Sequence, residues 1–281
     1  MKFRFIFFIA LATFSIAAKA QLINITASKN GNLYVMGGYH RDWYSKSDIY
    51  IKGNYVYDSG VPAEAQGREY EFILLGATAI DKPDIKNISE WDVNLPQFYY
   101  RVGYLFYNEN IIGLELGFDQ LNYSMKSDQT IRVQGVLFDS TTNDVDSVDR
   151  PMIVGDNFVK YEHSGLNYLT LSFVRGMHLW RTRTEMHSIQ CLVKPGAGIA
   201  VPHTLISVYG HNMKQGYQVA GYVAQLEVAF RYILAEQLFI ETGAKGSYVN
   251  LSNIHTPEGT SAHQTFTVFQ WMISVGYQFH L

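Results

Sequence analysis

The sequence predicts an all-β fold: a transmembrane antiparallel up-and-down β-barrel of about eight strands with long extracellular loops. About eight segments alternate apolar and polar residues with a period of two, as strands with one buried face do. After the N-terminal run, no stretch approaches the 18 apolar residues of a membrane-spanning helix. Aromatic residues reach 15% while charged residues are only 17%, against about 25% charged residues in ordinary soluble domains.

The first twenty residues have the pattern of a cleavable signal peptide. A basic start, MKFR, precedes the apolar run FIFFIALATFSIAA, and AKA directly before Gln21 fits a small-x-small cleavage site. The alternative is a membrane anchor, but the run is short for a span of about 20 residues. We expect residues 1–20 to be removed on export, leaving residues 21–281 as a single β-barrel domain.

Composition narrows the classes of partner and cofactor. The single cysteine, Cys191, allows no intramolecular disulfide. A net charge of -3 lacks the basic footprint of nucleic-acid binding, so no nucleic acid is expected. The acidic run LFDSTTNDVDSVD lacks the glycine and the terminal glutamate of the twelve-residue calcium loop. We therefore expect a solvated acidic loop, no metal and no cofactor.

The predicted strands have one apolar face and one face of small or charged residues. In chain order they are residues 32–44, 97–107, 111–123, 165–180, 188–201, 217–233, 238–251 and 265–281. In the fourth, Tyr168 and Val174 fall on the polar side, and Pro195 in the fifth predicts a bulge. In the last, Phe269 and Trp271 should face lipid while Gln270 faces the interior.

The second face predicts a narrow interior closed by ion pairs. A soluble sandwich would turn a face rich in lysine and glutamate to water. Here that face is rich in glycine, and its charges are sparse and nearly balanced: Arg101, Glu115, Asp119, Lys194, Glu227, Arg231, Glu241 and Lys245. An eight-stranded barrel is just wide enough for side chains to fill it. We expect these eight residues to form a charge network inside a plugged lumen.

The connections alternate between short and long. Short links follow the second, fourth and sixth segments, while residues 45–96, 124–164, 202–216 and 252–263 form long ones. This asymmetry is typical of transmembrane barrels, whose long loops face outside the cell. Alternation over residues 47–57 predicts a β-hairpin above the membrane. The apolar stretch 69–83 could touch a partner, close the barrel mouth as a lid, or pack against other loops.

The run YEHSGLNY holds the candidate catalytic residues. Glu162, His163 and Ser164 are an acid, a possible base and a possible nucleophile. Neighbours on a strand point to opposite faces, so His163 and Ser164 are not expected to meet directly. Catalysis would need a partner from another loop, such as His40, Asp42 or His203. The alternative is a polar strand at the barrel rim.

Together, the signal peptide, the paired amphipathic strands and the aromatic last strand resemble small eight-stranded bacterial outer-membrane β-barrel proteins over about residues 32–281. The resemblance implies the outer membrane of a Gram-negative cell and a last strand read by the barrel assembly machinery. Tyr277 and Phe279 fit that assembly signal, and Leu281 stands where phenylalanine is commoner. YSKSDI combined with YEHSGLNY is similar to a group of outer-membrane barrels of unknown activity.

Two enzyme families share the architecture that this resemblance implies. Lipid A deacylases of the outer membrane pair a histidine and a serine two residues apart, whereas His163 and Ser164 are adjacent. Lipid A palmitoyltransferases begin with an amphipathic helix, which QLINITASKNG does not form convincingly. Neither likeness assigns a role to a residue.

The sequence favours a monomeric, non-enzymatic protein with surface-binding or envelope-structural function, acting through its first two long loops. Its expected partners are outer-membrane lipid and lipopolysaccharide, together with the assembly machinery. The alternative is a lipid-modifying enzyme, an acyl hydrolase or acyltransferase, with His163 as base and Ser164 as nucleophile. A narrow conduit is the third possibility, and it would require the charged lumen to open.

Overall fold

A computed structural model describes residues 31–56, 60–63, 65–81, 97–107, 111–184 and 186–280. The signal peptide expected at residues 1–20 and Leu281 lie outside the described residues. Within the described part of the chain, no helix has the length and apolarity needed to cross a membrane.

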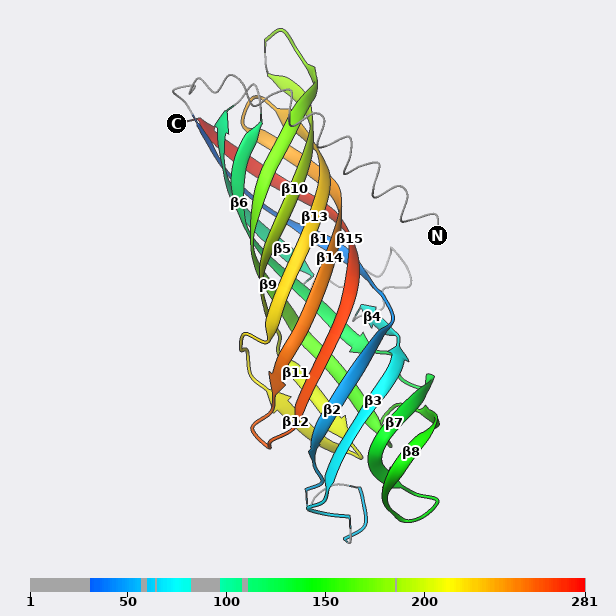
Figure 1. Cartoon of the computed structure of the whole chain (residues 1–281). Helices are drawn as coiled ribbons and strands as arrows, with labels where there is room; N and C mark the ends of the chain where they lie inside the picture. The colour runs from blue at the N-terminus through cyan, green and yellow to red at the C-terminus, as the bar shows by residue number, and fades with distance from the viewer. Residues whose placement is uncertain are drawn as a thin grey trace, which may run out of the picture.

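Eight strands close into a ring (Figure 1). They are β1 (Asn32–Tyr44), β5 (Phe98–Tyr107), β6 (Ile112–Met125), β9 (Val159–Arg181), β10 (His187–Val201), β13 (Gly221–Leu234), β14 (Leu238–His255) and β15 (Ser261–His280). Each pairs antiparallel with the ring strand that follows it in the chain, and β15 pairs with β1 to close the ring. Every ring strand overlaps one predicted segment, and β13 begins four residues later than predicted, at Gly221. The predicted fold, a transmembrane up-and-down β-barrel of the outer-membrane type, is confirmed.

The two faces of the ring strands separate as the alternation predicts. On β15, Phe269 and Trp271 are each 51% exposed, while Gln270 between them is fully buried. A free-standing soluble protein would not present such a continuous apolar band to water, and lipid is the solvent that suits it. Aromatic rings mark both margins of this band, with Trp43 and Phe269 at one end and Tyr104 and Phe279 at the other.

Most of the long links fold as strands that continue the barrel wall. They are β2 (Ser47–Asn54), β3 (Glu69–Ala77), β4 (Ala79–Asp81), β7 (Thr130–Asp139), β8 (Asp144–Ile153), β11 (Thr204–Val208) and β12 (His211–Gln215). β2 follows β1 along β15 and pairs with β3 in the hairpin that alternation predicts. β3 pairs with β7, β7 with β8, and β11 with both β9 and β12. We call this part the extension; in Figure 1 it lies at the opposite end from the C-terminus.

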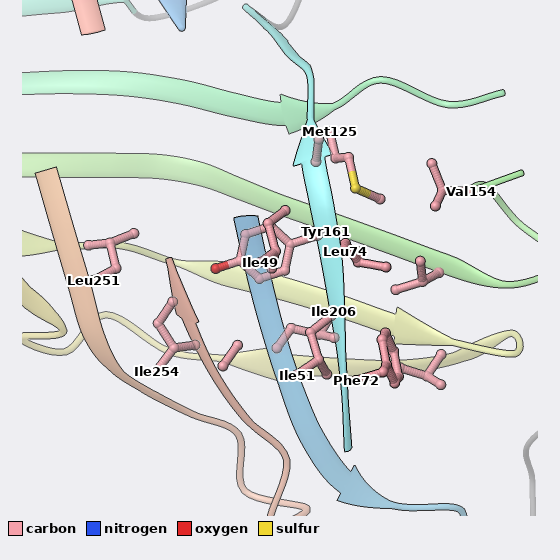
Figure 2. Packing of buried hydrophobic residues seen from close by; sticks show 14 of the residues in the cluster. Ile49, Ile51, Phe72, Leu74, Met125, Val154, Tyr161, Ile206, Leu251 and Ile254 are labelled. Atoms are coloured by element: carbon pink, nitrogen blue, oxygen red, sulfur yellow. The ribbon is translucent and has the colours of Figure 1, made fainter. Parts of the chain in front are cut away.

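The extension has its own apolar core. Figure 2 shows side chains from five strands converging in it: Ile49, Ile51, Phe72, Leu74, Met125, Tyr161 and Ile206. For the stretch 69–83, the sequence allowed three roles: a partner contact, a lid on the barrel mouth, or packing against other loops. Its side chains Tyr70, Phe72 and Leu74 point inward, each at most 1% exposed. These side chains pack within the extension.

The bulge predicted at Pro195 is wrong. The register of β10 against both β9 and β13 continues unchanged across Lys194 and Pro195, and the irregularity in this strand falls between Ile189 and Gln190. Proline costs one ladder hydrogen bond, and here the β9 ladder omits its pairs at residues 194 and 195 without shifting.

Candidate functional site

The lumen brings together all eight charged side chains that parity places on the inward face. Lys194 stands at the centre, with its Nζ 3.0 Å from a Glu115 oxygen, 3.1 Å from Glu227 and 2.6 Å from Glu241. Arg231 contacts Glu241 at 2.7 Å. Four cations and four anions meet in this network, so its formal charge is balanced.

The rest of the network lies towards the extension. Arg101 contacts Asp119 at 2.7 Å and Glu115 at 3.3 Å, and Lys245 Nζ lies 3.0 Å from Asp119. The side chains of these residues are at most 1% exposed. Removing such charges from water costs several kcal/mol per ion, which only close partners offset. The network therefore requires all its members in place.

Inward glycines make room for these large side chains. A Cβ on Gly103 would lie 2.1 Å from the Tyr34 ring, and one on Gly117 would lie 3.1 Å from the Arg101 guanidinium. The Tyr34 hydroxyl in turn donates to Glu115 at 2.5 Å. The inward face is therefore rich in glycine because the tyrosine and arginine side chains of neighbouring strands occupy the space that other side chains would need.

Apolar layers lie on both sides of the charge network. Towards the short turns, Tyr34, Met36 and Phe239 are buried in one cluster, and the Arg231 guanidinium stacks over the Phe239 ring at 4.1 Å. Towards the extension, Tyr123 and other side chains of the second cluster fill the barrel. A charged layer between two apolar layers is the packing of a plugged barrel.

His163 is buried at the base of the extension and does not meet Ser164. Its Nδ1 lies 2.9 Å from the Thr204 hydroxyl and its Nε2 lies 3.4 Å from the Gln264 side-chain oxygen. Burial lowers the pKa of His163 to about 4, because desolvation disfavours the imidazolium. Glu162 accepts a hydrogen bond from Ser124 at 3.0 Å. The three candidate residues of this run therefore have three different environments.

Ser164 instead contacts His203. Its Oγ lies 3.0 Å from His203 Nδ1, on the exposed outer rim where the extension begins. The pairing of Thr204 with His163 sets His203 beside Ser164. A bulge lies next to this contact: Asn122 pairs with Ser164 and Leu121 with Leu166, so Gly165 is an extra residue with a φ of 92°. Glycine is the residue that tolerates this backbone.

The other partners considered from the sequence pair with each other. His40 and Asp42, at 2.8 Å, lie on the inward side of β1. His203 follows Pro202, in the short link between β10 and β11. Nothing in the sequence ranks His203 above His40, because its distance from Ser164 depends on the bulge and on the pairing of β11 with β9.

The acidic run lies on the β7–β8 hairpin, where its carboxylates have protein partners. Asp139 contacts Arg150 at 2.6 Å and Asp149 contacts Arg132 at 2.7 Å; Asp144 pairs with Arg68. Hydrogen bonds from Thr141 and, to a smaller extent, from the Arg150 guanidinium lower the pKa of Asp139 to about 2. Among the described residues, no cluster of three or more acids, histidines or cysteines could hold a metal ion.

On the last strand, Tyr277 and Phe279 turn outward with their ring centroids 4.8 Å apart. The third residue of the expected assembly signal, Leu281, lies outside the described residues.

Comparison with known proteins gives matches among solved structures. No family model matches the chain, and no curated protein matches it. The attachment invasion locus protein Ail of Yersinia pestis is 12% identical, with 89% of this chain and 99% of that one covered and a TM-score of 0.33. OprG of Pseudomonas aeruginosa is 12% identical, with 92% and 100% covered and a TM-score of 0.36. The outer membrane protease OmpT of Escherichia coli is 10% identical, with 92% and 99% covered and a TM-score of 0.38. Values this low carry no functional information, and the fold is assigned from the strand pairing itself.

Proposed function

We propose that the chain is a monomeric outer-membrane protein that binds an external ligand through its extension and performs no chemistry in its lumen. The observation that carries this proposal is the apolar core of the extension, which holds seven strands beyond the ring in a fixed arrangement. A barrel needs no such structure to stay in the membrane, whereas a preorganised surface lowers the cost of binding.

Location and assembly belong to the same proposal. The expected export signal and the closed barrel suit the outer membrane, with lipid and lipopolysaccharide around the apolar band. Tyr277, Phe279 and Leu281 would be the signal that the barrel assembly machinery reads. With an even number of strands in the ring, both chain ends lie with the short turns, so the extension faces outside.

The β7–β8 hairpin of the extension offers the residues for a test. Val136 and Ile153 are apolar but 44% and 65% exposed, so replacing them leaves the core untouched. Cells carrying wild-type protein would be applied to a printed glycan array and to collagen- and fibronectin-coated surfaces. We expect retention on at least one probe, reduced at least five-fold by Val136→Asp with Ile153→Asp. Equal retention of cells with and without the protein on every probe, at normal surface levels, would contradict a binding role.

The contact between Ser164 and His203 supports a second candidate, an acyl hydrolase acting on membrane lipid. Ser164 Oγ would attack the acyl carbonyl and pass its proton to His203 Nδ1. His203 would return that proton to the departing alkoxide, and water would then cleave the acyl-serine ester. An unchanged lipid A mass spectrum on deleting the protein removes this candidate. If the spectrum does change, Ser164→Ala should abolish the change and His163→Gln should keep it.

A further inference from the structure

A groove of about 430 Å³ opens on the outer surface where β1 passes into β2 beside β15. We call it the outer groove; its lining includes Lys46, Asp48, Tyr50, Ile73, His263 and Thr265. None of these residues belongs to the lumen network or to the contact between Ser164 and His203. The outer groove is a separate feature of the extension.

The outer groove lies directly beyond the margin of the apolar band. On β15 the outward residues change from Phe269 to Thr265 and His263 within six positions. Trp43 pairs with Phe269, their ring centroids 5.7 Å apart, and Lys46 is three residues further along the chain. A strand rises about 3.3 Å per residue. Because barrel strands tilt by about 35–45°, the groove begins roughly 7–8 Å above the aromatic margin, on the aqueous side of the headgroup level at which such rings sit.

The chemistry of the outer groove suits a sugar ring that carries an anionic group. The rings of Tyr50 and His263 stack at 4.4 Å with an interplanar angle of 19°, and a stacked aromatic pair is a rigid surface for the flat, apolar side of a sugar. Asp48 is held in place because its Oδ1 accepts the Gly76 N–H at 2.7 Å. Its remaining lone pairs suit hydroxyl donors, and the Lys46 ammonium suits a phosphate.

We propose that the outer groove binds the phosphorylated sugar headgroup of a glycolipid in the outer leaflet. The stacked Tyr50 and His263 hold the sugar, Asp48 accepts from its hydroxyls, and Lys46 pairs with its phosphate. The acyl chains then lie along the apolar band past Trp43 and Phe269. This inference rests on the proposed function, since it requires the extension to face outside. Proximity to the band favours a lipid over a soluble saccharide of the same chemistry.

The test uses the full-length mature protein in phosphatidylcholine nanodiscs, with deep-rough lipopolysaccharide and phosphatidylglycerol as separate probes. The groove variant combines Lys46→Ser with His263→Ser. The control combines Lys214→Ser with His255→Ser, which removes the same side-chain types from exposed positions on β12 and at the end of β14, outside the groove lining. We expect the groove variant to bind lipopolysaccharide at least ten-fold more weakly than wild type, the control to bind normally, and phosphatidylglycerol binding to be equal in all three. Matching circular dichroism spectra establish that the variants fold.

Equal affinity of wild type and groove variant for lipopolysaccharide would overturn the proposal. If the delipidated, phosphorylated oligosaccharide binds as tightly as intact lipopolysaccharide, the claim that the ligand is a lipid rather than a soluble saccharide is contradicted. Loss of this inference is distinguishable from loss of the proposed function, because the array experiment probes Val136 and Ile153 on the β7–β8 hairpin, outside the groove. Retention on the array with no groove effect removes only the glycolipid site.

Discussion

Lys194 is the residue on which the lumen network depends most, because three carboxylates share its ammonium. Replacing it with methionine keeps the aliphatic volume but leaves those carboxylates without their common cation. Breaking a buried ion pair in this way costs about 3–5 kcal/mol. We expect Lys194→Met to lower the free energy of unfolding by that amount in urea titrations of the protein in detergent.

Lys52 provides the matched control, since its ion pair with Glu71 lies on the exposed face of the extension. Surface pairs are screened by water and contribute little, so Lys52→Met should leave the urea midpoint nearly unchanged. Equal midpoints for the two variants would show that the network does not stabilise the barrel.

His163 should make stability depend on pH in a defined window. Its folded pKa of about 4 lies below the ordinary value of 6.5, so the unfolded chain binds a proton that the folded protein excludes. The stabilisation is complete above pH 6.5 and is lost as pH falls towards 4. The full loss is about 3 kcal/mol, at roughly 1.4 kcal/mol per pKa step. Asp139, with a pKa of about 2, contributes only at lower pH.

Thermal unfolding at pH 7.5, 6 and 4.5 tests this prediction. The wild-type melting temperature should fall across the series, and His163→Gln, which has no titrating ring, should fall much less. Parallel curves for the two proteins would assign the pH dependence to other groups.

At the scale of the strands, close packing of Gly103 against Tyr34 joins β5 to β1. Gly103→Ala places a methyl group against the Tyr34 ring, and such overpacking costs about 1–3 kcal/mol. Gly246→Ala is the control, because nothing lies within 4 Å of its added methyl group. We expect a lower melting temperature for the first variant only; equal values would mean that the ring shifts to admit the methyl group.

The ring strands could be predicted because one physical rule governs them all. Each residue faces either lipid or a lumen too narrow for loose water, so the two-residue alternation is preserved, as Phe269, Gln270 and Trp271 illustrate. The same parity selects the inward charges. Tyr168 and Val174 are apolar residues on the side of their strand that was predicted to be polar. They lie there because apolar side chains also fill the lumen.

The extension and the rim contact could not be predicted in the same way. β3 pairs with β7 and β11 with β9, and local alternation carries no information on partners so distant in sequence. The contact between Ser164 and His203 depends on the pairing of β11 with β9 beside the extra residue Gly165. The sequence could name His203 as a candidate, but the pairing of β11 with β9 brings it to Ser164.

For the molecule as a whole, the layers in the lumen predict that the barrel does not conduct. Apolar clusters lie on both sides of the charge network, so an ion would have to leave its hydration shell to cross apolar layers, at a high cost in free energy. Planar-bilayer recordings of the purified protein should show no stable conductance steps at moderate voltage. Reproducible ohmic conductance steps would contradict a plugged lumen and support the function of a narrow conduit.

The central claim is that the extension is a preorganised surface presented outside the cell. Its most direct test is labelling with a membrane-impermeant maleimide, after Cys191→Ser removes the native thiol. Ile153→Cys marks the extension, and Thr184→Cys marks the exposed turn between β9 and β10 at the other end. On intact cells the account predicts labelling of the Ile153→Cys variant alone, with the Thr184→Cys variant reacting only after permeabilisation. Labelling of the Thr184→Cys variant alone on intact cells would contradict it.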